Sequence, residues 1–96
     1  MHLYLGTNGR VAAIDPKNGR IAWETKLPEI PTGYRVVTVM EHDGRVFAGC
    51  RGYLFALDAA TGKILWTNRL KGFGYHPFSL AVAGRSVQVV PTYRDS

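Results

Sequence analysis

The hydrophobic positions of this chain fall in short runs, each bounded by residues that favour turns. Residues 36–40 and 46–50 are β-branched or apolar, and His42-Asp43-Gly44 between them is a hairpin signal. We expect residues 53–57 to form a third strand and residues 63–69 a fourth. Because no segment keeps helical periodicity over about ten residues, the pattern predicts an all-β fold of short antiparallel strands.

The same pattern occurs twice, 43 positions apart. Residues 4–15 align with residues 47–58 without a gap, and the match continues through Trp23 and Trp66. A third copy begins at residues 79–82, which correspond to residues 36–39, and then becomes shorter. A four-stranded unit of about 40–45 residues repeated in tandem is typical of the blades of a β-propeller.

The repeat predicts one partial propeller domain over residues 1–96, with about two blades of four antiparallel strands in the chain. Residues 1–33 correspond to a first blade that lacks its innermost strand, and residues 34–76 to a complete second blade. Residues 77–96 correspond to the start of a third blade.

Each copy contains the same set of turn and packing residues. The first set is Ala13, Asp15, Gly19 and Trp23, and the second set is Ala56, Asp58, Gly62 and Trp66. An aspartate at a strand end can accept hydrogen bonds from the turn that it opens, and the glycine can adopt the left-handed conformation that closes the hairpin. The tryptophan offers a large flat surface on the outer strand, and the small alanine leaves room for it. We expect these residues to hold one blade against the next.

The motif resembles the tryptophan-docking motif of quinoprotein-type propellers, which are related to the pyrroloquinoline-quinone (PQQ) dehydrogenases. The second copy fits in full, and the first departs only at Asn18, where the motif has threonine. The resemblance implies a structural role for the eight motif residues. The quinone-binding members also have a vicinal cysteine pair, a tryptophan that stacks on the cofactor and a set of Ca²⁺ ligands. This chain has one cysteine, and both of its tryptophans occupy motif positions. We therefore expect no catalytic, cofactor-binding or metal-binding residues, and no enzyme activity.

Composition narrows the possible partners. The net charge is +5, but the twelve lysines and arginines are spread along the chain without a cluster, which argues against nucleic-acid binding. No apolar run is long enough to cross a membrane. The chain shows no signal peptide, so we expect a cytoplasmic location if it is full-length. A periplasmic or secreted location applies if it is a fragment.

The resemblance orders the strands of each blade outward from the propeller axis, and this order gathers several loops on one face. That face carries the candidate binding residues, which are Tyr34, Arg35, Arg51, Tyr75 and His76. Tyrosine and arginine are common in binding hot spots, and loops on a rigid scaffold often carry function. The alternative is that the Gly-Tyr pairs at Tyr34 and Tyr75 only shape the approach to the innermost strand.

We expect a non-catalytic PQQ-like propeller module that serves as an assembly or protein-interaction scaffold. One alternative is a propeller that binds a small ligand. The other is a fragment of a larger quinoprotein enzyme whose cofactor site is missing.

Two blades do not close a ring, so we expect the chain to associate with itself. Residues 78–83 correspond to a spare innermost strand, which could complete the first blade of another copy. Head-to-tail contacts of this kind would join three or four chains in a ring. Residues 86–90 would then compete with residues 3–7 for one position, and the rival explanation is a truncated product of a longer propeller gene.

Overall fold

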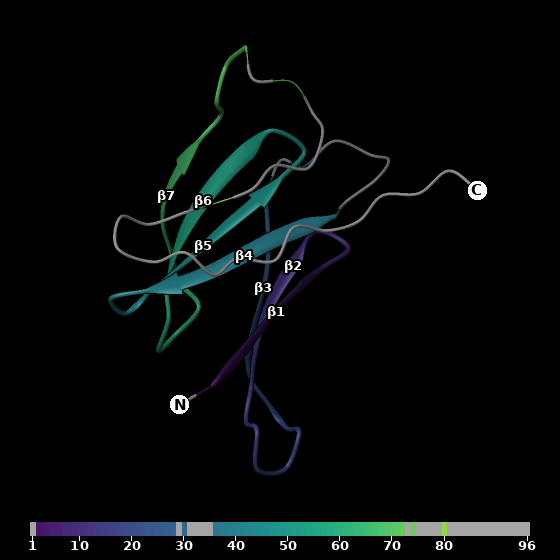
Figure 1. Ribbon diagram of the computed structural model, residues 1–96, viewed down its shortest axis with the longest axis vertical. Helices are drawn as coiled ribbons and strands as arrows, with labels where there is room; N and C mark the ends of the chain where they lie inside the picture. Colours follow the sequence, from purple (N-terminus) through teal and green to yellow (C-terminus); the bar gives the residue numbers. More distant parts are fainter. Residues whose placement is uncertain (1, 29, 31–35, 73, 75–79, 81–96) are drawn as a thin grey trace, which may run out of the picture.

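The computed structural model describes residues 2–28, 30, 36–72, 74 and 80, and the described part of the chain consists of β-strands joined by turns (Figure 1). The strands are β1 (Leu3–Thr7), β2 (Arg10–Ile14), β3 (Ile21–Lys26), β4 (Val37–His42), β5 (Arg45–Cys50), β6 (Tyr53–Asp58) and β7 (Ile64–Asn68). The all-β fold and the four strands expected in the second repeat are therefore confirmed. No helix occurs among the described residues.

The strands form two antiparallel sheets. The first sheet has the order β1-β2-β3, and the second has the order β4-β5-β6-β7. The internal repeat is visible in the register, because Ala13 lies opposite Trp23 in the first sheet and Ala56 lies opposite Trp66 in the second. A β-bulge follows both alanines. The arrangement is consistent with partial propeller blades, and within the described residues no strand of the first sheet corresponds to β4.

Tight turns connect the paired strands. Asn8-Gly9, Asp43-Gly44 and Arg51-Gly52 each have positive φ at both residues. Consecutive positive φ values are typical of the type I′ turns that match the twist of two-residue hairpins. These three turns fix the register of β1 with β2, of β4 with β5 and of β5 with β6.

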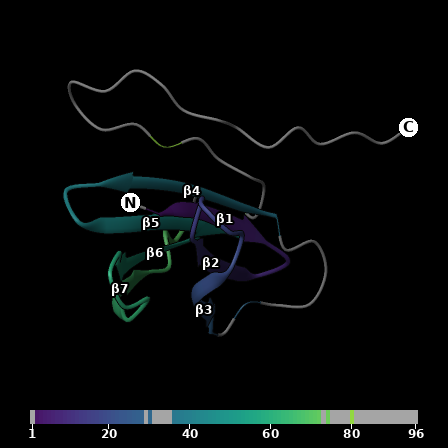
Figure 2. The same ribbon diagram turned by 90° about the horizontal axis from the view of Figure 1, so that it is seen from below.

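The hydrophobic core lies between the two sheets. Val11 and Leu27 contribute from the first repeat, and Val46, Phe55 and Leu57 contribute from the second. Strand β1 lies beside β4 at this contact (Figures 1 and 2). Gly6 permits the close approach, because a Cβ atom there would lie 2.7 Å from the side chains of Val37 and Val39.

Several expectations lie outside the described residues. They concern Tyr34, Arg35, Tyr75 and His76 of the expected binding face, and residues 78–83 and 86–90 of the third repeat apart from Leu80.

Candidate interaction surfaces

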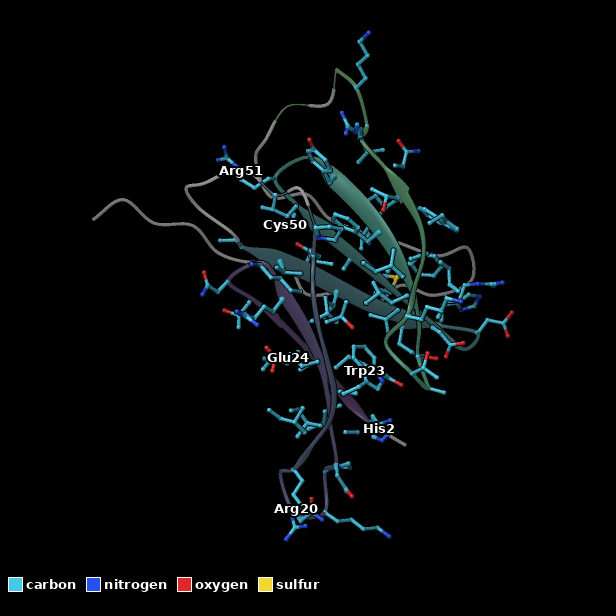
Figure 3. The ribbon with its side chains drawn as sticks, turned by 180° about the vertical axis from the view of Figure 1, so that it is seen from behind. His2, Arg20, Trp23, Glu24, Cys50 and Arg51 are labelled. Carbon is cyan, nitrogen blue, oxygen red and sulfur yellow. The ribbon has the colours of Figure 1, made fainter. Side chains whose placement is uncertain are left out.

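Trp23 lies on β3, on the side of the first sheet that faces the second sheet. Its cross-strand partner Ala13 is fully buried and has too small a side chain to displace the indole ring. The ring lies beside the ring of Tyr4, with 6.2 Å between the centroids. Figure 3 shows Trp23 on the side of the second sheet and its neighbour Glu24 on the opposite side.

The indole ring contacts the turn that joins β6 to β7. Its Nε1 donates a 2.9 Å hydrogen bond to the main-chain oxygen of Ala59, and the ring covers the backbone of Gly62. A Cβ atom at Gly62 would lie 2.6 Å from Cδ2 of Trp23, so only glycine leaves room for this contact. The hydroxyl of Thr25 donates to the Gly62 oxygen at 2.6 Å. One turn of the second repeat is therefore held by three side-chain and ring contacts from the first.

Hydrogen bonds within the β6–β7 turn hold its backbone, and the main-chain oxygens of Ala59 and Gly62 accept hydrogen bonds from the first sheet. Oδ1 of Asp58 accepts hydrogen bonds from the amides of Ala60 and Thr61, at 2.8 and 3.2 Å. The Gly62 amide donates to the main-chain oxygen of Asp58 at 2.8 Å, and Gly62 has a φ of 81°. This aspartate forms the type of Asx turn that its place at the strand end predicts.

The corresponding turn of the first repeat is built in the same way. Oδ1 of Asp15 accepts a hydrogen bond from the amide of Lys17 at 2.9 Å. The Gly19 amide donates to the main-chain oxygen of Asp15 at 2.8 Å. Oδ1 of Asn18 accepts from the Arg20 amide, as Oγ1 of Thr61 does from the Lys63 amide. The exchange of threonine for asparagine therefore keeps the hydrogen bond.

The two copies differ in what contacts them. Gly62 is buried under Trp23, whereas Gly19 is exposed and a Cβ atom there would meet nothing within 4 Å. Trp66 is 45% exposed, although its ring lies 6.2 Å from Phe47 just as Trp23 lies 6.2 Å from Tyr4. Among the described residues, the two tryptophans therefore differ in their contacts: Trp23 covers a turn of the other repeat, whereas the Trp66 ring is largely exposed.

Tyr4 lies at the contact between the sheets. Its hydroxyl donates a long hydrogen bond of 3.5 Å to the Ala59 oxygen. Burial raises the pKa of the Tyr4 phenol, and the negative charge of Glu41 on β4 raises it further. Both causes favour the neutral, hydrogen-bonding form of the side chain.

Of the expected binding face, Arg51 is the residue that the structure describes. It lies in the β5–β6 turn with a φ of 53° and is half-buried. A shallow pocket is lined by Tyr53, Arg69, Leu70, Lys71, Gly72 and Gly74. The guanidinium of Arg69 lies over the Tyr53 ring, 6.0 Å from its centroid. Sequence reasoning did not single out Tyr53 and Arg69, although their positions beside the turn and before Lys71 could have indicated them.

A second groove lies between β1 and β4. It is lined by Tyr4, Leu5, Gly6, Thr7, Val36, Val37, Thr38 and Val39. The hydroxyl oxygen of Thr38 is buried without a hydrogen-bond partner. Strand β1 corresponds to β5 in the repeat, and in the second sheet β5 pairs with β4.

Within the described residues, no cluster of three histidine, cysteine or acidic side chains is arranged to hold a metal ion. Cys50 is 1% exposed and belongs to the core, where it packs with Val37 and Phe55. None of the described segments is a helix of the length and apolarity that a membrane span requires.

Comparison with known proteins agrees with the repeat. A family profile described as "Outer membrane protein assembly factor BamB" matches residues 7–95. The chain is 30% identical to polyvinylalcohol dehydrogenase of Sphingopyxis sp. (strain 113P3), over 78% of the chain and 14% of that protein. It is 30% identical to outer membrane protein assembly factor BamB of Yersinia pestis, over 68% of the chain and 19% of that protein.

A third relative is quinohemoprotein alcohol dehydrogenase ADH IIB of Pseudomonas putida, which is 36% identical over 67% of the chain and 11% of that protein. The chain thus corresponds to less than a fifth of the length of each of these relatives. Because the family match covers nearly the whole sequence, the chain belongs to the BamB-like family of PQQ-repeat proteins.

Proposed function

We propose that this chain is a non-catalytic PQQ-like propeller module that acts as an assembly or protein-interaction scaffold. The observation that carries the proposal is the contact of Trp23 with Ala59 and Gly62. In this role the eight motif residues join one blade to the next. The similarity to an assembly factor supports the same assignment.

The tryptophans and the motif aspartates, all within the described part of the chain, do not fit a quinone cofactor with its Ca²⁺. The Trp23 ring packs against Gly62 between the sheets. Trp66 is on the edge strand β7, and its ring lies beside the ring of Phe47. The carboxylates of Asp15 and Asp58 accept hydrogen bonds from their own turns. We therefore infer that dehydrogenase chemistry, if it belongs to a longer protein, depends on other blades.

An activity assay tests the scaffold proposal against the enzyme alternative. Purified protein is supplied with PQQ and Ca²⁺ and mixed with primary alcohols and an artificial electron acceptor. We expect dye reduction no faster than in the protein-free control. Stoichiometric quinone binding with alcohol-dependent dye reduction would overturn the scaffold assignment.

A small-ligand function has one observation in its favour, which is the pocket beside Arg69 and Lys71. The two cations and the Tyr53 ring suit an organic anion. A thermal-shift screen with aromatic carboxylates tests it, and Arg69→Gln is the variant that should abolish any stabilisation. If no carboxylate raises Tm, the ligand alternative is rejected and the scaffold function is unaffected.

We also infer that the module associates with itself head to tail, as a ring of three or four chains. The exposed apolar side chains at both ends of the sheet pair support this assignment. The similarity to an outer membrane assembly factor supports a periplasmic or secreted location over a cytoplasmic one.

A further inference from the structure

The shallow pocket beside Tyr53 lies at the end of the second sheet that carries the β5–β6 turn. Tyr53 begins β6, and Arg69 and Lys71 follow the end of β7, so the pairing of β6 with β7 brings these side chains to one place. We propose that the scaffold binds a partner through this pocket, and that the pocket recognises an acidic polypeptide segment. The inference rests on the proposed scaffold function and specifies the chemistry of the partner.

Two cationic side chains line the pocket. The guanidinium of Arg69 lies over the Tyr53 ring, 6.0 Å from its centroid, and this contact helps to hold the charge at the wall of the pocket. Lys71 is exposed, and it forms no ion pair within the described part of the chain. Both charges favour an anion in the pocket, whatever other contacts the two side chains make.

The backbone of the pocket also suits an anion. Leu70 and Gly72 have positive φ values of 46° and 90°, whereas Lys71 between them does not have positive φ. A change in the sign of φ at successive residues turns neighbouring amides toward one side, and such concavities bind anions. The Leu70 amide donates to Oδ1 of Asn68 at 2.8 Å. The amides of Lys71 and Gly72 are therefore the ones that a carboxylate would approach.

The acidic groups of the second sheet lie at its far end. Glu41 and Asp43 are at the β4–β5 turn, and the register places Asp58 opposite Arg45 at the same end. Because Tyr53 and Asp58 are the two ends of β6, about 17 Å of extended strand separates them. This is about twice the Debye length at physiological ionic strength, so these carboxylates do not neutralise the pocket.

The described carboxylates of the first sheet also lie away from the pocket. Glu24 points away from the second sheet and pairs with Arg10 at 2.8 Å (Figure 3). Asp15 belongs to the turn that ends at Arg20, which lies at the opposite end of the molecule from Arg51 and the β5–β6 turn (Figure 3). Among the described residues, no carboxylate is therefore placed to compete with an acidic partner.

The shape of the site favours a polypeptide as the occupant. The cationic and glycine residues of the pocket are exposed, so it is too open to bury most of a small ligand, as small-molecule sites usually do. An acidic segment of a protein can add contacts beyond the pocket, and complementary charge gives the contact its specificity. The Tyr53 ring already stacks with Phe55 at 6.2 Å and lies under Arg69, which leaves less of it for a nucleic-acid base.

An NMR titration of the ¹⁵N-labelled chain tests the proposal. The probe is a peptide of six glutamates with acetylated and amidated ends, so that only its side-chain carboxylates are charged. We expect a saturable binding curve, with chemical-shift changes concentrated at the amides of residues 69–72. Salt at about 1 M should weaken the binding, because it shortens the Debye length to about 3 Å.

Two variants separate this site from a general attraction to a basic chain. Lys71→Gln removes a cation of the pocket and should raise the Kd for the peptide about two- to fivefold, the usual effect of one exposed ion pair. Lys63→Gln is the matched control, because Lys63 is also exposed and lies at the opposite end of the second sheet, beside the β6–β7 turn. This control should leave the Kd unchanged.

Two further probes test other occupants. Glutarate carries carboxylates without a peptide, and single-stranded oligothymidine carries phosphates and bases. We expect both to bind more weakly than the peptide.

Several results would overturn the inference. They are an absence of shifts at residues 69–72, an equal loss of affinity in Lys63→Gln and Lys71→Gln, and binding of glutarate or oligothymidine as tight as that of the peptide. None of these results bears on the non-catalytic scaffold assignment, which the dye-reduction assay tests separately.

Discussion

Nε1 of Trp23 donates a 2.9 Å hydrogen bond to the main-chain oxygen of Ala59. The two residues are 36 positions apart in the sequence and belong to different repeats. A side chain of the first sheet thus satisfies a backbone group of the second. The ring that supplies the hydrogen bond also covers Gly62, so a polar and an apolar contact are made by one residue. This relationship links the two sheets through the side chain of one residue.

Trp23→Ala should lower the free energy of unfolding by about 3–5 kcal/mol, because the large ring leaves a cavity between the sheets. Trp23→Phe should lower the free energy of unfolding by less than Trp23→Ala does. Its cost should exceed the cost of the lost ring area by about 1–2 kcal/mol, because the Ala59 oxygen loses its closest donor. Urea denaturation followed by circular dichroism measures both variants.

Trp66→Ala is the matched control, and it should cost less than about 1 kcal/mol in the dissociated chain because the Trp66 ring is 45% exposed there. If Trp66→Ala destabilises the dissociated chain as much as Trp23→Ala does, the assignment of the Trp23 contact as the main link between the sheets is wrong.

Gly62→Ala should destabilise the chain by about 3 kcal/mol. Part of this cost is the positive φ of 81°, and the larger part is the overlap of the new methyl group with the Trp23 ring. Gly19→Ala has nearly the same φ, of 75°, and no neighbour within 4 Å, so it should cost only about 1 kcal/mol. The difference between the two measured values isolates the contact from the backbone strain. Equal values would show that the indole ring moves aside freely.

The repeat made most of the fold predictable. A period of 43 with turn residues at fixed offsets located the strands, because tight turns and period-two alternation are local properties of the chain. The same repeat identified Trp23 and Gly62 as members of one motif. It did not show that the described residues cover Trp23 and leave Trp66 45% exposed, because that difference depends on the contact between the two sheets.

The pocket beside Tyr53 is a second feature that the sequence did not single out. It depends on the placement of Arg69 over the Tyr53 ring, which brings together residues on different strands. The spacing of charges along the sequence carries no information about which residue lies on the strand opposite Arg69. Local sequence patterns predict which segments form strands. Which side chains lie opposite each other also depends on the pairing register of the strands.

Gly6→Ala tests the close approach of β1 to β4. Gly6 has an ordinary backbone conformation, so the substitution adds no conformational strain. The new Cβ atom would lie 2.7 Å from the side chains of Val37 and Val39, which must move. We expect a loss of about 1–3 kcal/mol, the usual cost of an extra methyl group in a packed interior. Val37→Ala in the Gly6→Ala background should recover part of this loss, and no recovery would place the effect elsewhere.

The last prediction concerns alkaline pH and Tyr4. Burial and the charge of Glu41 raise the pKa of this phenol in the folded chain, whereas the unfolded chain has the ordinary value of about 10. As pH rises past about 10, the unfolded state therefore loses its proton first, and the free energy of unfolding falls until pH passes the folded pKa. Tyr4→Phe removes this contribution, so its stability should fall less steeply over the same pH range.

Urea midpoints measured from neutral pH to above the ordinary tyrosine pKa give the two slopes, and phenolate absorbance reports the titration directly. Glu41→Gln provides the second comparison. It should lower the pKa of Tyr4 only in part, because burial is the larger of the two causes. A Tyr4→Phe chain whose stability falls as steeply as that of the wild type would assign the alkaline transition to other groups, and the contact of Tyr4 with Ala59 would then contribute little.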